Sequence, residues 1–354
     1  MHHSRPDSSG KRRNAPPQQE DEQSRGVGSG FIISGDGYIL TNDHVIKAVA
    51  GNVDRPQGLA LFNNGSQYIF KILARLPQED IAILKIETDD GLIGWGEGKN
   101  AAGSAGNYGT LVRLINEDFG PRLIGRDPAD ITFIWEDLYN GVRAEKASRS
   151  GHAMPEMARR GLTVSAISAI DIALWDILGK AEGKPVWKLL GGRKADRLPA
   201  YASGGWADAD HIGEQLKSYI SAGGFGAVKM RVGAMDAAPH ISAERVRAAR
   251  KALGPNIELA VDAHGTYTVS GARRFAQMVA DCDLAWFEEP IIADDKAGIA
   301  EVRATIPIPI ATGESEATRF AFRDLAVRRA ADIFQPDPAF CGGITEAMRI
   351  GTIA

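Results

Sequence analysis

The feature that most constrains the fold is an alternation, from Arg197 onward, of short apolar runs with spacers of helix-compatible sequence. The spacers carry amphipathic patterns such as AERVRAARKALG and ARRFAQMVADC, in which apolar residues recur at helical spacing. This alternation predicts repeated βα units on a parallel sheet, arranged either as a doubly wound sheet or as a barrel. The six runs read LPAYAS, AVKMRV, IELAVDA, LAWFEEP, IPIATGE and DIFQPDP.

Carboxylates end three successive runs of this series. Asp262, Glu288 and Glu314 follow one another at intervals of 26 residues, one βα unit each. Because the carboxyl ends of barrel strands meet at one face, the equal spacing predicts that the three side chains form one cluster. Clustered carboxylates repel one another unless a cation holds them, and a hard divalent ion such as Mg²⁺ suits this donor set. A single acid at a strand end is often only a cap or turn residue, so the shared register is what favours a site.

Other polar residues lie at the same predicted edge. Lys229 and Arg231 end the run AVKMRV, and side chains two positions apart on a strand point to the same side. Asp337 ends the last run, in QPDP. His264 follows Asp262 by two residues, and it is either a turn residue or an acid within the pocket.

The chain before this series changes texture twice. Residues 1–24 are polar, charged and rich in proline, which predicts a disordered tail. Residues 25–87 contain short β-rich runs separated by Gly, Asp and Asn, which is typical of antiparallel hairpins. Residues 88–195 begin with a glycine-rich stretch and continue with helical periodicity, including an apolar stripe from Ile167 to Leu178. The βα series then occupies residues 196–354.

Composition excludes several classes of function. Lys plus Arg number 41 against 45 Asp plus Glu, a net charge of −4, so the chain lacks the positive field that nucleic acids and anionic membranes require. The longest apolar stretch, Leu162 to Leu178, carries Asp171 and Asp176, and no apolar leader is visible, so we expect neither a membrane span nor a signal peptide. Two cysteines cannot form a disulfide framework, which favours the cytoplasm. We expect the six tryptophans to be core or interface anchors.

Several strings together resemble one known family. VKMRVG, VDAHG, WFEEP, ATGES and QPDPAFCGGIT, with RRGLTVSAISAIDIALWDILGKAEGKPVWKLLGG upstream, resemble the enolase superfamily in its mandelate racemase and muconate lactonizing branch. The resemblance covers residues 88–354 and implies an α/β fold, a modified (β/α) barrel preceded by a partial α+β capping domain at residues 88–195. It also implies Mg²⁺ bound by Asp262, Glu288 and Glu314, with Glu289 the less favoured carboxylate of the EEP string.

The resemblance further implies a reaction. Family members abstract the proton α to a carboxylate, with a Lys or His base, and the metal stabilises the enediolate. Lys229 takes the place beside the substrate carboxylate, and Arg231 stands where many members have a second lysine. Asp337 resembles the acid that orients a histidine on the following strand. His264 resembles a histidine that protonates a leaving hydroxyl, which favours dehydration of an acid sugar over racemisation, epimerisation or cycloisomerisation.

The sequence departs from the family pattern in its base and in its strand count. Arg231 stays protonated and is a poor base, so two-base racemisation is disfavoured and Lys229 is left as the base candidate. Only six of the eight barrel runs occur before Ala354, and the histidine expected after Asp337 is absent. We expect the two open edges of such an incomplete barrel to favour self-association.

Residues 25–87 carry a second resemblance, to the start of the trypsin-like domain of the HtrA/Deg serine proteases. In that interpretation His44, in TNDHV, is the triad base and Asp80, in QEDIAILKI, is the orienting acid. A GNSGG-like nucleophile motif does not follow, and the nearest string, ASGGW, offers Ser203. We therefore expect a fusion of a protease fragment with an incomplete enolase-type chain.

These patterns predict an α/β protein with an incomplete enolase-type barrel that uses Mg²⁺ to dehydrate a small acid-sugar carboxylate. Three alternatives stay open: a racemase, epimerase or cycloisomerase of the same superfamily, a protein derived from a serine protease, and an inactive fusion fragment.

Overall fold

The computed structural model describes residues 82–100, 109–140, 160–193, 196–234, 236 and 238–354, together with the backbone of four short strands nearer the N-terminus. The chain divides into two compact units, Met1–Gln78 and Glu79–Ala354. In the first unit the described strands form two antiparallel pairs, β1 with β2 and β3 with β4, and they coincide with predicted β-rich runs. These strands are β1 (Gly30–Ile32), β2 (Ile39–Thr41), β3 (Gln57–Leu61) and β4 (Gln67–Lys71).

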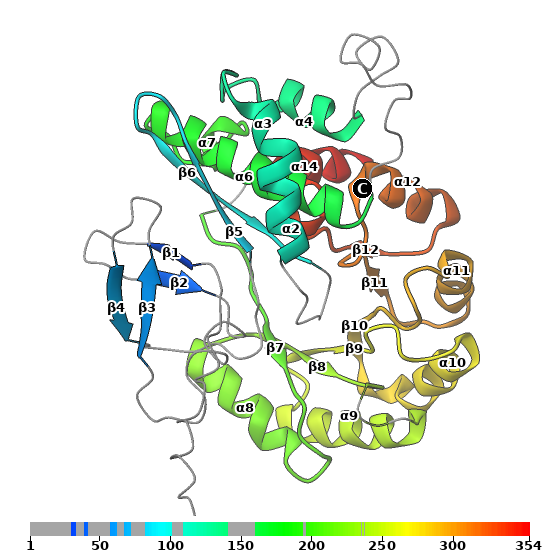
Figure 1. Ribbon diagram of the computed structural model, residues 1–354. Helices are drawn as coiled ribbons and strands as arrows, with labels where there is room; N and C mark the ends of the chain where they lie inside the picture. The colour runs from blue at the N-terminus through cyan, green and yellow to red at the C-terminus, as the bar shows by residue number, and fades with distance from the viewer. Residues whose placement is uncertain are drawn as a thin grey trace, which may run out of the picture. The chain divides into compact units, whose positions relative to one another are not determined.

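The second unit contains a six-stranded sheet with the order β12-β11-β10-β9-β8-β7. Every neighbouring pair in it is parallel, so each strand lies beside the one that precedes it in the chain (Figure 1). The predicted βα series and the α/β enolase-type fold class are therefore confirmed. The strands are β7 (Ala202–Gly204), β8 (Ala227–Arg231), β9 (Glu258–Asp262), β10 (Leu284–Glu288), β11 (Ile310–Thr312) and β12 (Ile333–Phe334).

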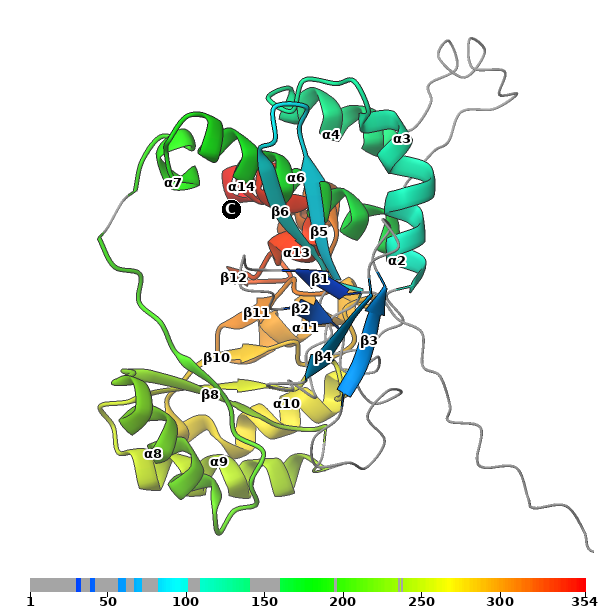
Figure 2. The same ribbon diagram turned by 60° about the vertical axis from the view of Figure 1, so that its left-hand side comes forward.

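Helices connect these strands and cover the outer side of the sheet (Figures 1 and 2). Apolar side chains from both layers form one core, in which Phe275, Phe287 and Phe322 are fully buried. Burying a side chain of this size contributes on the order of 1.5–3 kcal/mol to folding. The helices are α8 (Ile212–Gly223), α9 (Pro239–Leu253), α10 (Val269–Met278), the 3₁₀ turn η2 (Ala280–Cys282), α11 (Lys296–Thr305), α12 (Thr318–Arg328), α13 (Pro338–Cys341) and α14 (Gly343–Ile353).

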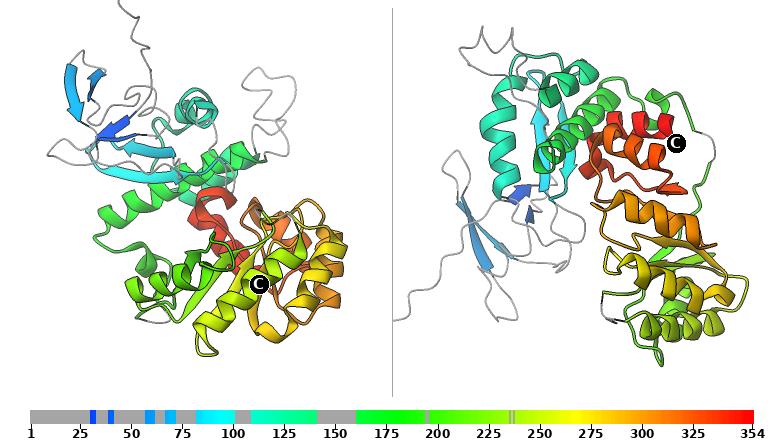
Figure 3. Two further views of the ribbon diagram at one scale, coloured as in Figure 1. Left: turned by 90° about the horizontal axis from the view of Figure 1, so that it is seen from below. Right: turned by 90° about the vertical axis from the view of Figure 1, so that its right-hand side faces the viewer.

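A hairpin and a group of helices precede the sheet (Figure 3). Strand β5 (Ala82–Glu87) pairs antiparallel with β6 (Ile93–Gly98), and residues 88–92 form the turn between them. The helices are α2 (Gly109–Arg113), the π-helical turn η1 (Leu114–Phe119), α3 (Gly120–Leu123), α4 (Ile131–Asn140), α6 (Leu162–Ala181) and α7 (Val186–Leu189).

Strand β6 is rich in glycine because it packs directly on the backbone of α6. A Cβ added at Gly94 would collide with the carbonyl oxygen of Ala173, and one at Gly96 would collide with that of Ala169. Alternate positions on a strand face the same side, so these glycines present a side-chain-free face to the helix. The glycine-rich stretch is thus a packing device.

Helix α6 is the central helix of this part. Its predicted apolar stripe is buried against α4 and the hairpin, with Ile167, Ile170, Leu174 and Ile177 in one core cluster. By length and composition α6 could cross a membrane, but 67% of its most apolar window is buried inside the protein, as in the core helix of a soluble protein. The described residues therefore support a core role for this helix.

A polar stripe on α6 faces the turn between α13 and α14. Ser165 donates to the carbonyl of Ala339, and Ser168 accepts the N–H of Gly342 at 2.9 Å. Further along α6, Asp171 accepts the N–H of Thr345 at 3.0 Å, and Trp175 donates to the Thr345 hydroxyl at 2.9 Å. The residues on α6 recur at intervals of three, three and four, so they share one face of the helix.

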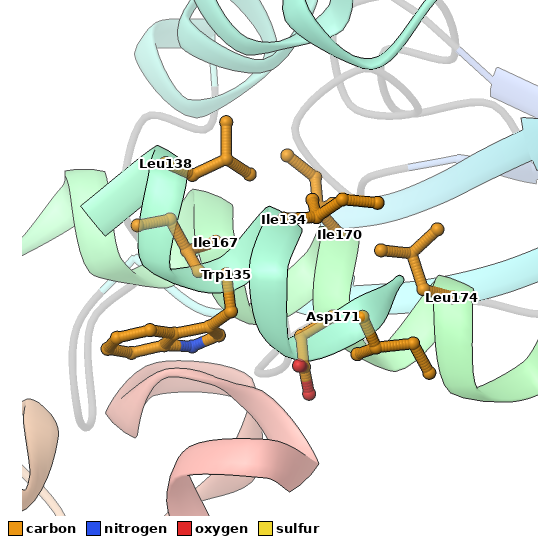
Figure 4. Close-up of a pocket in the computed structure, with 8 residues that line it drawn as sticks. Ile134, Trp135, Leu138, Ile167, Ile170, Asp171 and Leu174 are labelled. Atoms are coloured by element: carbon orange, nitrogen blue, oxygen red, sulfur yellow. The ribbon is translucent and has the colours of Figure 1, made fainter. Parts of the chain in front are cut away.

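Asp171 and Trp135 meet α14 at one end of a small, mostly apolar pocket (Figure 4). Trp135, from α4, donates its indole N–H to the carbonyl of Gly342 at 2.6 Å. The Asp171 carboxylate points toward the first turn of α14, whose N–H groups need acceptors. These bonds fasten the helices that precede the sheet to the last helix of the βα series. The pocket lining is Ile131, Ile134, Trp135, Leu138, Ile167, Ile170, Asp171 and Leu174.

Candidate functional site

The three carboxylates predicted as metal ligands lie at the carboxyl ends of three adjacent parallel strands. Asp262 is the last residue of β9, Glu288 is the last residue of β10, and Glu314 follows β11 by two residues. Asp262 and Glu288 are direct register partners. Both are almost fully buried, at 1% and 2% exposure, whereas the Glu314 side chain is 27% exposed.

Lys229 joins the first two of these carboxylates. Its Nζ lies 2.5 Å from Oε1 of Glu288 and 3.3 Å from Oδ2 of Asp262. Burial lowers the pKa of Lys229, but the charges of Asp262 and Glu288 outweigh burial and raise its pKa above the ordinary value. The lysine is therefore held as an ammonium ion between the two acids.

Arg231 lies on the same side of β8, as the KxR spacing predicts. Its guanidinium donates to Oδ2 of Asp262, the oxygen that also faces Lys229. The guanidinium carbon also lies 5.6 Å from the centre of the Trp206 ring. Arg231 thus stands between a buried carboxylate and an aromatic side chain.

Glu314 has a partner that sequence reasoning missed. Lys99, just after β6, places its Nζ 2.7 Å from Oε1 of Glu314 and 3.1 Å from Oδ2 of Asp337. Burial lowers the pKa of Lys99, but the hydrogen bond and charge of Glu314, with those of Asp337, raise it above the ordinary value. The main chain of Lys99 is fixed as well, because its N–H donates to the carbonyl of Ala339 at 3.0 Å.

The second oxygen of Glu288 is also bound. Gln335 Nε2 donates to Oε2 of Glu288 at 2.7 Å, and Trp286 Nε1 lies 3.3 Å from the same oxygen. Sequence reasoning missed Gln335, which directly follows β12 in the string QPDP. Its position two residues before Asp337, at the end of the same strand, was the available signal.

His264 and Glu289 both have left-handed backbone conformations, with φ of 47° and 38°. Such values are uncommon for residues with side chains, and they mark sharp turns as the chain leaves β9 and β10. The His264 N–H donates to Oδ1 of Asp262 at 2.9 Å, and its Nδ1 lies 3.6 Å from Oε2 of Glu289. His264 is thus both a turn residue and a neighbour of the acidic cluster.

Glu289 is a buried carboxyl group next to the other acids at this edge. It is only 4% exposed, and its Oε1 has no hydrogen-bond partner. Burial, followed by the charges of Asp262, Glu314 and Glu288, raises the pKa of Glu289 to about 7. The surrounding cations, Lys229 among them, do not fully compensate the acids.

This donor set fits a hard divalent cation. Carboxylate oxygens are the ligands that Mg²⁺ prefers, and the orphaned oxygen of Glu289 shows that the cluster has unmet demand for positive charge. Each of the three carboxylates forms an ion pair with a lysine: Asp262 and Glu288 pair with Lys229, and Glu314 pairs with Lys99. Within the part of the chain that the structure describes, no three His, Cys, Asp or Glu side chains are already gathered around one metal position.

The remaining predicted residues fall in two groups. Asp337 accepts the N–H of Ala339 at 2.9 Å as the cap of α13, and its other oxygen pairs with Lys99. Ser203 is an exposed residue within β7. His44 and Asp80 lie outside the described residues, so the protease resemblance stays a hypothesis.

Two known protein families match most of the second unit of the chain. Residues 211–354 match the family described as enolase C-terminal domain-like, and residues 73–191 match the N-terminal domain of mandelate racemase and muconate lactonizing enzymes. The second match includes Asp80 and β5, which the protease interpretation had assigned to the other fragment.

Similar proteins match most of the chain. D-galactarolactone cycloisomerase of Agrobacterium fabrum is 35% identical over 276 residues, covering 77% of this chain and 67% of that protein. Arabinonate dehydratase of Saccharolobus solfataricus is 34% identical over 287 residues, covering 80% of this chain and 72% of that protein.

Solved structures agree with these relatives. A member of the enolase superfamily from Polaromonas sp. JS666 aligns with a TM-score of 0.69 and 35% identity, over 79% of this chain and 73% of that one. A racemase from Streptomyces coelicolor A3(2) with bound magnesium aligns with a TM-score of 0.68 and 32% identity, over 78% of this chain and 73% of that one. Two matched families, the parallel sheet and these similarities agree: the chain belongs to the enolase superfamily, in its mandelate racemase and muconate lactonizing branch.

Proposed function

We propose that this chain is a Mg²⁺-dependent dehydratase of a small acid sugar. The observation that carries the proposal is the row of Asp262, Glu288 and Glu314 at adjacent strand ends, with Lys229 bonded to the first two. Relatives named arabinonate dehydratase and D-galactonate dehydratase support the substrate class.

The metal would be held by Asp262, Glu288 and Glu314. When bound, Mg²⁺ supplies a fixed positive charge that polarises the substrate carboxylate and stabilises the negative charge developing on it. Gln335 and Trp286 support this role from the chain side, because their hydrogen bonds fix the orientation of the Glu288 carboxylate.

Lys229 is the proposed base. The bond between the α carbon and its hydrogen breaks, the proton moves to Nζ of Lys229, and the electron pair passes into the carboxylate as an enolic double bond. Lys229 can accept this proton only after its ion pairs with Glu288 and Asp262 open and it has given up its own ammonium proton to solvent, because both acids hold it in the ammonium form. Arg231, which stays protonated, binds an oxygen of the substrate.

His264 is the proposed acid. As the bond from the β carbon to its hydroxyl breaks, the imidazolium donates a proton to the leaving oxygen, so water departs and an enol that tautomerises to a 2-keto acid remains. The position supports this role, because the side chain is 34% exposed beside buried Glu289, with Nδ1 3.6 Å from that carboxylate.

Incubation with acid sugars tests the proposal. D-galactonate, arabinonate and L-rhamnonate are mixed with the chain and millimolar Mg²⁺, and the 2-keto acid product is measured by its semicarbazone absorbance. We expect product with at least one of them and none from E288Q, while E258Q, changed at the opposite end of β9, retains activity. If none of the acid sugars gives a product, the dehydratase proposal is contradicted.

Cycloisomerisation of an acid-sugar lactone is the second candidate, because D-galactarolactone cycloisomerase is among the relatives. It uses the same α-proton abstraction but opens the lactone instead of expelling water. Loss of D-galactarolactone with no keto acid from the open-chain substrates would favour this activity.

Cytoplasmic location and self-association of the chain stay predictions, which fractionation and light scattering can check.

A further inference from the structure

We propose that Trp206 is a preformed contact for the carbon chain of the substrate, placed beside the reacting end and distinct from the metal and proton-transfer residues. The inference rests on the proposed function, since it takes the ligand to be an acid sugar. It concerns a residue at the end of β7 for which the chemistry of proton abstraction has no use.

Trp206 differs from the anchor that sequence reasoning predicts. Its side chain is 45% exposed, whereas that of Trp135 is only 1% exposed. An exposed indole forgoes part of the burial that normally stabilises a tryptophan, and its exposed surface is available to a ligand.

The loop that carries Trp206 is fixed by two side chains. Oε1 of Gln215 accepts the main-chain N–H groups of both Trp206 and Ala207 at 2.9 Å. Arg245 donates to the carbonyls of Gly205 at 3.0 Å and Ala207 at 2.8 Å. The main chain on each side of the indole is therefore bound from both directions.

Arg245 is itself firmly held. It is 4% exposed, and its Nη1 lies 2.8 and 2.9 Å from the two oxygens of Asp236. The same nitrogen donates to the carbonyl of Arg231 at 3.0 Å, so one guanidinium fixes the chain at the ends of both β7 and β8. The Trp206 loop and the candidate catalytic strand share one rigid support.

Gly205 sets the direction of the loop. Its φ is 73°, and an added Cβ would lie 2.6 Å from the Cβ of Met230. A left-handed glycine pressed against β8 turns the chain sharply, and the next residue, Trp206, then faces outward. The exposure of the indole follows from built-in backbone geometry.

The neighbourhood of the indole indicates its ligand. The Arg231 guanidinium lies 5.6 Å from the ring centre on one side and bonds to Asp262 on the other. A substrate whose carboxylate end lies at Asp262 and Glu288 would extend past Arg231 toward Trp206. Acid sugars carry C–H groups along that chain, and the electron-rich face of an aromatic ring attracts their partial positive charge.

The test uses three substitutions at one position and a matched control. W206A removes the ring, W206L keeps apolar volume without it, and W206F keeps an aromatic face. The control, W187A, removes an indole that is 38% exposed and that stacks with Arg193 at 4.9 Å, on α7. Steady-state kinetics use the acid sugar that the wild type turns over fastest, and thermal unfolding checks each variant.

We expect W206A and W206L to raise KM about tenfold with kcat within about twofold, W206F to stay within about threefold of the wild type, and W187A to be unchanged. An unchanged KM in W206L would overturn the inference, as would a fall in kcat alone, which would mean that the ring acts only by holding Arg231. If W206A does not fold, W206L against W206F still decides between the outcomes. Absence of turnover in the wild type would instead contradict the proposed function itself.

Discussion

At the scale of single residues, ion pairing at the strand ends governs what the site can do. Lys229 and Arg231 both contact Asp262, and Lys229 also contacts Glu288, so four side chains from three neighbouring strands depend on one another. Their proximity could be predicted from the sequence, because the residues end successive predicted strands and because side chains two positions apart on a strand point to the same side.

Lys99 and Gln335 could not be predicted in the same way. Lys99 lies 215 residues before its partner Glu314, and Gln335 lies 47 residues after Glu288. Contacts at such distances arise only when separate elements pack together. Lys99 carries no local pattern, and the place of Gln335 directly after β12 indicates the edge of the sheet but not the partner. The proposed roles of the carboxylates, Lys229 and His264 stay predictions until they are measured.

Removal of the candidate base tests its role. We expect K229M to lose α-proton exchange by about 10²–10⁴-fold, because general base catalysis contributes a factor of this size. Exchange is followed by proton NMR in D₂O, and K180M, which removes a lysine from an ion pair at the far end of α6, serves as the control. Retained exchange in K229M would show that another group is the base.

Removal of the candidate acid should separate the two halves of the reaction. We expect H264N to keep α-proton exchange and to lose dehydration by about 10²–10⁴-fold, because the hydroxyl then departs without a proton. Keto acid formation and deuterium content are measured in the same sample. Undiminished keto acid would remove His264 from the mechanism.

Asp171 predicts a pH dependence of stability. Burial is the main cause that raises its pKa from 3.8 to about 6, so the folded state binds this proton more tightly than the unfolded state does. The contribution of Asp171 to the free energy of unfolding should therefore fall by about 3 kcal/mol as pH rises from about 4 to 6, and stay level above that range.

D171N tests this dependence, since asparagine keeps an oxygen that can accept the Thr345 N–H but carries no charge. Urea unfolding between pH 4 and 8 should show a smaller fall in D171N than in the wild type. The Glu289 carboxyl, whose pKa is raised to about 7, adds a fall of the same sign in both proteins, so their difference isolates Asp171. Parallel profiles would contradict the assignment.

At the scale of elements, strands were easier to predict than the contacts between layers. The runs of the βα series could be predicted as strands because short apolar runs bounded by turn signals are typical of buried strands, whereas helices need longer segments. Strand β6 carries Gly94, Gly96 and Gly98, and glycine by itself argues against a strand. This segment forms a strand because it pairs with β5 and packs on α6. The polar stripe of α6 was likewise obscured by the apolar residues around it.

Close packing of β6 on α6 gives a prediction at this scale. We expect G96A to lower the free energy of unfolding by about 1–3 kcal/mol, because its methyl group would press on the Ala169 carbonyl. The matched control is G226A, where an added Cβ meets nothing within 4 Å. Equal stability of G96A and G226A in urea would show that the strand can move away from the helix.

At the scale of the whole molecule, the carboxylate row connects stability to metal binding. A cation that binds only the folded chain, at about 100 times its dissociation constant, adds about 2.7 kcal/mol to the free energy of unfolding. We expect Mg²⁺ to raise the thermal midpoint of the wild type and of E258Q, and to leave that of E288Q unchanged. An equal rise in E288Q would contradict the ligand assignment.

The most direct measurement is proton exchange at the α carbon of acid sugars in D₂O with millimolar Mg²⁺. Abstraction of this proton is common to dehydration and to cycloisomerisation, so exchange reports on the shared step whichever of the two products forms. The account predicts deuterium at the α position of at least one substrate, or in its product, with the wild type and a strong loss of it with K229M. Absence of deuterium from every acid sugar with a folded, Mg²⁺-stabilised wild type would contradict it.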